Sequence, residues 1–435
     1  MARGKKKETL TPEERLQAAL VPESEQPYKV PENWCWVRLL DSFYNCTDSK
    51  KKIPQKEYIH SGELAVVDQG QDLVGGYTND SEIAFSGNLP VIIFGDHTRC
   101  IKYIDFPFAQ GADGVKVLKP KRCFDVKAFY YAFQNVNIPN MGYRRHFPLF
   151  NQYAIPLPPL PEQHRIVDRI ESLFAKLDEA KQKAQDALDS FETRKAAILH
   201  KAFTGELTAQ WRREHSVGIE SWEERTIVDL CSMIIDCPHS TPEWSDKGKI
   251  CLRTTNIKDG YLDLSDVRYV TDDIFDQRNR RAVPQAGDVL LTREGNIGDV
   301  GVIPENVEIC LGQRMMLLRP NKCQSAFLIY FFRNPKILTD IKAGTMGSTA
   351  PRMNIKDIKQ LKIHCPNDKE QAEIVRILDD LLAKEQQAKE VAEGVLEQID
   401  LIKKAILARA FRGELGTNDP SEESAVELLK QILSC

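Results

Sequence analysis

The chain has 435 residues, too many for one ordinary hydrophobic core, and this length predicts two or three domains. Its 42% hydrophobic and 28% charged residues are typical of a soluble globular protein. The net charge of −4 excludes a global excess of cations, so any surface for nucleic acid must be a local concentration of positive charge.

No apolar run approaches the roughly 18 residues that span a membrane, and the basic start MARGKKKETL leads into charged sequence instead of the apolar segment of a signal peptide. The 11 cysteines are odd in number and include no CxxC pair, which predicts reduced thiols and a cytoplasmic location. Cys231, Cys237 and His239 are the nearest approach to a metal pattern, and we expect no metal site there.

Residues 1–31 are predicted to form a short helix followed by a linker. Thr11 can cap a helix over residues 11–20, Pro12 suits its first turn, and Glu14 completes a capping box. Three prolines then favour an extended chain up to the first globular segment.

Two globular domains are predicted, over residues 32–160 and 222–365. Each has short β-type runs separated by glycine and proline, among them NLPVIIFGDHT in the first and DVLLTREGNIGDVGVIP in the second. The glycines of GNIGDVG are predicted to serve a hairpin. Each domain then has one apolar helix, DVKAFYYAFQNV or SAFLIYFFRNP. Both begin at a tryptophan, Trp34 or Trp222, so we interpret them as diverged copies of one mixed α/β unit.

Each domain leads into one copy of an internal repeat. Residues 162–207 match residues 370–415 without a gap, and 20 of the 46 aligned positions are identical. Their apolar residues recur at intervals of three and four, which predicts two long helices, over residues 161–207 and 366–415, that pair as a coiled coil. Some 40 residues make a helix about 60 Å long.

The predicted seam consists of Ile166, Ile170, Leu173, Leu177, Ala180, Ala184, Ala187 and Phe191 in the first copy, and Ile374, Leu378, Leu381, Ala388, Ala392, Val395 and Ile399 in the second. Glu385 interrupts the second seam and is predicted to lie near a helix end, in contact with water. The central alanines would align in parallel or antiparallel pairing. The short linker at 208–221 favours antiparallel pairing, and residues 416–435 are predicted to be a tail with a short helix.

Catalytic motifs are missing from the sequence. It contains no GxxxxGK[ST], HExxH or GxSxG, no GxGxxG after a strand, and no Asn/Asp-Pro-Pro-aromatic motif of a DNA methyltransferase. We therefore expect a protein that is not an enzyme.

The sequence resembles the specificity subunit of type I restriction-modification systems. The resemblance rests on PLPPLPEQHRIVDRIESLF and KAAILHKAFTGELT, on their echoes EQAEIVRILDDLLAK and KAILARAFRGELG, and on PENWCWVRL and GDVLLTREGNIGDVG. It covers nearly the whole chain. The second copy departs from it where IHCPNDKEQ replaces the proline-rich PLPPLPEQ, which puts the entry into the second helix in doubt.

The resemblance implies an α+β fold in which two target recognition domains are separated by a long antiparallel two-helix coiled coil. Each domain would read one half of a bipartite, asymmetric DNA site. The coiled coil would set the unread spacer and dock two modification (methyltransferase) subunits, and two restriction (motor-nuclease) subunits would complete the complex. No cofactor is expected in this chain, because S-adenosylmethionine, ATP and magnesium would belong to the partner subunits.

Side chains that could contact DNA are cationic or amide groups in local clusters. They are Lys50, Lys51, Lys52, Arg99, Arg144 and Arg145 in the first domain, and Arg253, Thr254, Asn256, Arg278, Arg280, Arg281, Arg293, Arg314 and Arg352 in the second. Any one of them could instead be a surface residue paired with a local carboxylate. Two other functions remain open: a coiled-coil adaptor that binds proteins, and a self-contained methyltransferase or nuclease.

Overall fold

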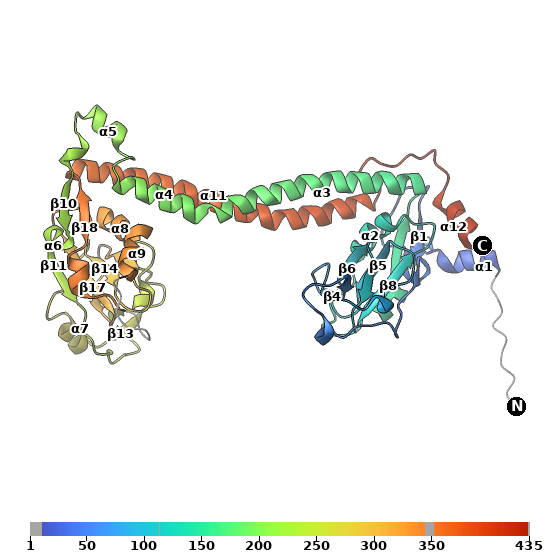
Figure 1. Cartoon of the computed structure of the whole chain (residues 1–435), viewed down its shortest axis with the longest axis horizontal. Coiled ribbons are helices and arrows are strands. Elements are labelled where there is room, and N and C mark those ends of the chain that lie inside the picture. Colours follow the sequence, from blue (N-terminus) through green and yellow to red (C-terminus); the bar gives the residue numbers. More distant parts are fainter. Residues whose placement is uncertain (1–10, 113, 344–351, 434–435) are drawn as a thin grey trace. The chain divides into compact units, whose positions relative to one another are not determined.

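The structure is a computed structural model that describes residues 11–112, 114–343 and 352–433 (Figure 1). The chain divides into two compact units, Met1–Lys183 with Val395–Cys435, and Ala184–Gly394. The division falls inside the long helices, so each unit contains one α+β domain and one stretch of paired helix. None of the helices in the described ranges is long and apolar enough to cross a membrane.

The first domain is built on three small sheets. A four-stranded antiparallel sheet has the order β2-β8-β5-β6, a three-stranded sheet has the order β4-β3-β7, and β1 pairs with β9. The strands are β1 (Cys35–Arg38), β2 (Phe43–Asn45), β3 (Leu64–Val67), β4 (Gly76–Thr78), β5 (Val91–Gly95), β6 (Ile101–Ile104), β7 (Phe108–Gln110), β8 (Val115–Pro120) and β9 (Ala154–Leu157). Helix α2 (Val126–Gln134) packs on the four-stranded sheet, where Phe129 and Phe133 are fully buried.

The second domain repeats this topology. Its sheets have the orders β11-β17-β14-β15, β13-β12-β16 and β10-β18. The strands are β10 (Glu223–Thr226), β11 (Cys231–Asp236), β12 (Lys249–Leu252), β13 (Arg268–Val270), β14 (Val289–Thr292), β15 (Val300–Val302), β16 (Ile309–Leu311), β17 (Met315–Pro320) and β18 (Lys362–Cys365). The helices are α6 (Ile227–Leu230), α7 (Asp272–Arg278), α8 (Ser325–Arg333), α9 (Pro335–Ala343) and α10 (Ile355–Lys359).

The shared topology confirms that the two domains are diverged copies of one unit. In both, one pair of strands in the three-stranded sheet is parallel (β3 with β7, β12 with β16), and every other pair in the three sheets is antiparallel. The expected hairpin is also present, since β14 and β15 pair across a turn in which Gly295 and Gly298 have positive φ angles.

Terminal segments of the chain meet beside the first domain. Helix α1 (Pro12–Ala19) begins as predicted, with the Thr11 hydroxyl accepting from the Glu14 backbone and Glu14 accepting in return. Helix α12 (Ala425–Leu433) lies in the predicted tail and packs against α1 (Figure 1).

The long helices pair antiparallel in both units. Helix α3 spans Leu160–Asp189, α4 spans Phe191–Phe203, and α11 spans Asp368–Ala410. In the first unit Lys403 of α11 forms an ion pair with Asp178 of α3. In the second, Lys389 lies over the Phe191 ring, and Glu385, one turn earlier, bonds Arg194, one turn later. The contacting residues have increasing numbers in one helix and decreasing numbers in the other. This order confirms the predicted antiparallel pairing (Figure 1).

The prediction of a single helix over residues 161–207 was wrong, because the helix is interrupted at Ser190. The carbonyl of Ala187 accepts from the Ser190 hydroxyl at 3.2 Å and from the Arg194 guanidinium at 3.1 Å. Side chains that bond helix carbonyls in this way compete with the backbone ladder. The last turn then ends at Phe203, and Gly205 follows in the left-handed region with φ 80°.

Most predicted seam residues are buried or half-buried, but Ala187 and Ala388 are exposed. Near the Ser190 interruption the buried positions change, so that Leu188 is half-buried and Lys389 covers Phe191. The expectation for Glu385 was also wrong. It lies well inside α11, its side chain is 21% exposed, and it bonds the Arg194 guanidinium at 2.8 Å.

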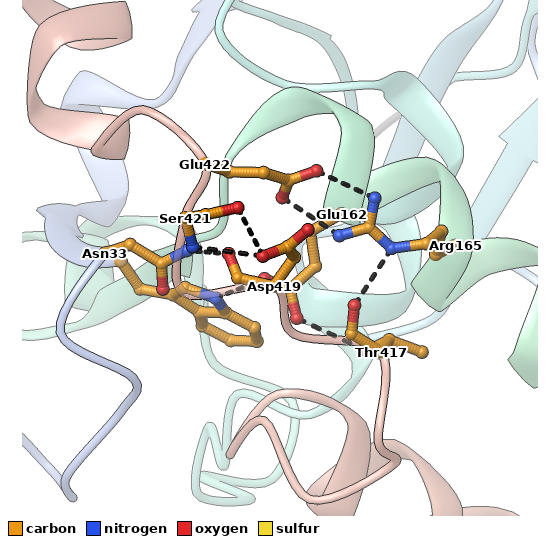
Figure 2. Close-up of polar contacts among 8 residues, drawn as sticks. Asn33, Glu162, Arg165, Thr417, Asp419, Ser421 and Glu422 are labelled. Carbon is orange, nitrogen blue, oxygen red and sulfur yellow. Dashed lines mark hydrogen bonds and ion pairs between the residues drawn. The ribbon is translucent and has the colours of Figure 1, made fainter.

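A buried glutamate opens the first long helix (Figure 2). The Glu162 carboxylate accepts from the Trp34 indole at 2.7 Å and from the Thr417 hydroxyl at 3.3 Å. Burial raises the pKa of Glu162, while these two bonds act in the opposite direction. One turn later Arg165 donates to the Thr417 carbonyl and forms a bidentate ion pair with Glu422. The segment after α11 is thus bonded to the start of α3.

In the second unit, the buried carboxylate of Glu370 is likewise bonded by the segment that follows the opposite helix, but by different donors. Its carboxylate accepts from the Thr208 hydroxyl at 2.7 Å and from the Arg212 guanidinium at 2.6 Å. Arg212 lies in α5 (Ala209–Glu214) and also covers the Trp222 ring. Within the predicted linker at 208–221, Thr208 and Arg212 are buried and satisfy this charge.

We predict that Arg212→Ala strongly destabilises the second unit. Glu370 is fully buried, and removal of one partner from a buried ion pair typically costs about 3–5 kcal/mol. Urea unfolding of the variant should show the loss. Lys183→Ala is the control, because it breaks only the exposed pair with Glu179 and should leave the unfolding free energy nearly unchanged. Equal effects of the two substitutions would contradict the anchoring role of Glu370.

Candidate nucleic-acid interface

The same backbone contacts occur in both domains and identify equivalent residues. After β5, the Asp96 amide donates to the Gly114 carbonyl at 2.6 Å. After β14, the Arg293 amide donates to the Arg314 carbonyl at 2.8 Å. Gly114 and Arg314 both precede the long central strand of the four-stranded sheet, and both have left-handed backbones, with φ 81° and 67°. The two domains therefore have glycine and arginine at one equivalent position.

Arg314 extends from the second domain. Its side chain is 61% exposed, and its only ion pair in the described residues is a long one, 3.7 Å, to Glu294. A residue with a Cβ atom is disfavoured in the left-handed region, where glycine is at no disadvantage. The strained backbone and the exposed guanidinium together make Arg314 a candidate contact for DNA.

Arg280 and Arg281 follow α7 and are exposed. They line a cavity of about 500 Å³ together with the loop from Pro238 to Glu243. Arg278 is buried beneath them and donates to the carbonyls of Leu311 and Ser240. This buried arginine holds the loop against the β16–β17 connection.

Sequence reasoning missed two polar side chains at this end of the domain, Thr241 and Gln313. The Thr241 hydroxyl bonds the Gln313 side-chain oxygen at 3.2 Å, and the Gln313 amide donates to the His239 carbonyl. Gln313 precedes Arg314 in the chain, so a hydrogen-bonding amide and an exposed guanidinium are carried by consecutive residues. The one signal in the sequence was the loop CPHSTPEW, whose prolines and hydroxyls separate two strands.

Three residues that were predicted to contact DNA are buried and bonded inside the second domain. Asn256 bonds the Arg253 amide and the carbonyls of Asp263 and Asp266, and it is buried. Arg293 is buried and forms an ion pair with Asp236 at 3.0 Å. Arg278 is buried in the same way. We therefore leave Asn256, Arg278 and Arg293 out of the proposed DNA contacts.

The other candidate residues of the second domain differ in their exposure and in their bonds to neighbouring residues. Arg253 pairs with Asp266 at 2.8 Å and its side chain is only 24% exposed. Thr254 is half-buried in a short turn that Asn256 closes. Arg352 is exposed, and its backbone bridges to Glu294, which places it near Arg314.

In the first domain, a loop at residues 138–146 extends to solvent. Tyr143 is 83% exposed, and its ring stacks on His97 with 4.6 Å between centroids. Arg144 and Arg145 follow it and are also exposed. The loop is fixed at its end, because the His146 amide donates to the Asp96 carbonyl just as the Met353 amide donates to Arg293. Arg145 and Arg352 are therefore equivalent.

The lysine run is less concentrated than predicted. Lys50 is exposed, Lys52 is half-buried, and Lys51 donates to the Glu82 carbonyl at 2.9 Å. Arg99 lies on the β5–β6 hairpin and donates to the Ile138 carbonyl. In the part of the chain that the structure describes, no group of three histidine, cysteine, aspartate or glutamate side chains could hold a metal ion.

Two domains of one topology, each with exposed cations on the loops at one end, and each packed on antiparallel helices, define a class of duplicated binding protein. The comparison with known families identifies it. The family described as "Type I restriction modification DNA specificity domain" matches residues 31–188 and 219–393, so the chain belongs to this family.

Individual relatives are distant. The chain is 29% identical over 306 residues to the EcoKI specificity subunit of Escherichia coli K12, covering 65% of this chain and 64% of that one. It is 26% identical over 301 residues to the Escherichia coli EcoBI specificity subunit, covering 64% and 63%. The match thus spans just under two thirds of these relatives.

Two solved structures show the same fold. The HsdS subunit of Thermoanaerobacter tengcongensis matches with a TM-score of 0.57 at 18% identity, over 90% of this chain and all of that one. A chain from a study of complex assembly and conformational transition in the type I R-M system matches with a TM-score of 0.60 at 19% identity, over 89% of this chain and all of that one. The predicted fold class is confirmed.

We predict that Arg293→Ala destabilises the second domain by roughly 3 kcal/mol, because it removes a buried guanidinium that forms an ion pair with Asp236 and donates to the Met353 carbonyl. Arg281→Ala should change stability by less than about 0.5 kcal/mol, since Arg281 is exposed. Thermal unfolding of the two variants measures the difference. A stable Arg293→Ala protein would return Arg293 to the candidate contacts.

Proposed function

We propose that this chain is the DNA-specificity subunit of a type I restriction-modification complex. Each α+β domain reads one half of a bipartite, asymmetric DNA site. The protein itself is not an enzyme, and it acts in the cytoplasm as part of a larger complex. Family membership supports this proposal, as do the exposed cations at one end of each domain.

The main support for the proposal is that the two domains share one topology but have different residues at equivalent positions. Where the second domain has the exposed Arg314, the first has Gly114. Where the first domain has Arg99, the second has Gly298. Two domains that share a scaffold but differ in their exposed donors suit two dissimilar half-sites.

The antiparallel helices supply the other parts of the function. We propose that they set the length of the unread spacer and dock two modification subunits, with two restriction subunits completing the complex. S-adenosylmethionine, ATP and magnesium belong to those partners. Half-sites one helical turn apart, about 34–36 Å, would lie on the same face of the duplex.

The alternative is a protein-binding adaptor with paired helices. The exposed side chains of Arg280, Arg281 and Arg314 favour DNA, because an exposed guanidinium suits phosphate or guanine. Retardation of duplex DNA by the chain together with its modification subunit distinguishes the two. Binding that depends on base sequence supports the specificity subunit, and a complex that ignores DNA supports the adaptor.

We predict that Arg280→Ala with Arg281→Ala weakens DNA binding at any sequence and lowers the dependence of log K on log salt by about 2, since each lost phosphate contact removes about 0.9. Fluorescence anisotropy at several salt concentrations measures both quantities. Arg213→Ala with Lys322→Ala is a matched control, because it removes two exposed cations from the same unit. Lys322 follows the opposite end of β17 from Arg314, and the control should leave the slope unchanged.

A second prediction concerns the spacer. Seven residues inserted at facing positions of α3 and α11 add about 10 Å of helix. The spacer should lengthen by about three base pairs, or methylation should be lost, with both half-sites unchanged. Mapping of methylated bases tests this prediction. Altered half-sites would show that the helices do not act as a spacer. Insertion into α3 alone is the control and should disrupt the helix pairing.

A further inference from the structure

A cationic cleft lies in the first unit between its domain and α11. It has a volume of about 620 Å³ and is bounded by the β5–β6 hairpin, the end of α2 and one face of α11. Its charged lining residues, within the described part of the chain, are Arg99 and Lys404, and no carboxylate is among them. Neither cation forms an ion pair with any described residue.

The second unit has an equivalent cleft of about 420 Å³ between its domain and α4. Leu407 of α11 lines the first cleft, and Leu199, its partner in the internal repeat, lines the second. The ends of the equivalent helices α2 and α8, at Gln134 and Arg333, also line their respective clefts. The charges that line these two equivalent clefts can therefore be compared.

The second cleft is neutral because it contains three cations and three carboxylates. They are Lys195, Lys258, Arg333, Glu192, Asp259 and Asp299. Asp259 binds Arg333 at 2.7 Å and Lys195 at 2.9 Å. Burial raises the pKa of Asp259, but the bonds and charges of these two cations outweigh it, so the pKa is lowered overall. The second cleft thus supplies its own anions, and the first does not.

Arg99 occupies a backbone position that favours glycine. Its φ angle is 61°, and its amide donates to the Gly95 carbonyl at 2.7 Å. In the second domain the corresponding bond runs from Gly298, with φ 92°, to Thr292. An arginine held in this region is strained, and such strain is often retained where a side chain has a function. One bond to the Ile138 carbonyl leaves most of the guanidinium donors free.

The cleft adjoins the exposed loop of the first domain. The hairpin that carries Arg99 also carries His97, which stacks on Tyr143, and Asp96, which holds the end of the loop at His146. Arg99 itself bonds the start of that loop at Ile138. A DNA backbone that passes Arg144 and Arg145 would therefore be close to the cleft.

We propose that this cleft binds a phosphate group of the DNA backbone at the half-site of the first domain, with Arg99 and Lys404 as its ligands. The proposal rests on the proposed function, because it takes DNA as the partner. A guanidinium and an ammonium that face one open space without a carboxylate suit a phosphate oxygen. The site positions the duplex and reads no base.

The test replaces two residues of the first cleft with the residues that stand at the equivalent positions of the second unit. Gly298 stands in the place of Arg99, and Ala196 stands in the repeat where Lys404 does. Arg99→Gly with Lys404→Ala should weaken DNA binding by the complex with modification subunits about tenfold and lower the salt slope by about 1. The methylated bases should stay the same. Thermal stability should be unchanged or higher, because glycine relieves the left-handed backbone.

A scan of single neutral methylphosphonates along the site locates the phosphate. At one position the neutral linkage should cost the wild-type complex about tenfold in affinity and the variant nothing. Arg122→Ala with Lys176→Ala is the matched control, since it removes two exposed cations of the same unit outside the cleft. The control should show wild-type affinity and the wild-type profile.

Four results would overturn the proposal. They are unchanged affinity and slope in the variant, an equal loss in the control, loss of stability in step with affinity, and loss of modification-subunit binding with DNA affinity retained. Titration with inorganic phosphate distinguishes the source, because tight binding of the free ion would make the cleft a small-anion site. If the wild-type complex binds no specific DNA, the proposed function itself fails.

Discussion

A buried carboxylate at the start of each long helix decides how this chain can be assembled. Glu162 and Glu370 are fully buried, and a charge removed from water must be compensated by nearby donors. In each case donors come from the segment that follows the opposite helix, Thr417 for Glu162 and Arg212 for Glu370. Parallel helices would place those segments at the wrong ends. The repeat is therefore satisfied by antiparallel pairing.

Duplication followed by divergence explains how one domain topology can recognise two different DNA half-sites. The strand orders of the two domains are the same, so their loops begin at equivalent places. At two left-handed positions one domain has glycine and the other arginine, as Gly114 with Arg314 and Arg99 with Gly298 show. Because the backbone at these positions accepts glycine, an arginine there can be gained or lost without rebuilding the fold.

Sequence reasoning succeeded where a few neighbouring residues decide the outcome. The capping box at Thr11, the hairpin around Gly295 and the apolar helices α2 and α8 follow from local chemistry, and all are present. It failed where a distant partner decides. Glu385 was expected in water, yet Arg194 of the other helix holds it. Arg293 was expected at the surface, yet Asp236 binds it inside the domain.

The sequence by itself determined the duplicated architecture, because a repeat of 46 residues and a three-four apolar spacing are visible along one dimension. It also supplied the set of cations from which the candidate contacts come. Only the tertiary structure decided which of them are free. A guanidinium is neutralised by whichever carboxylate or carbonyl the fold brings within about 3 Å. Arg278 and Arg314 therefore look alike in the sequence and differ completely in the folded domain.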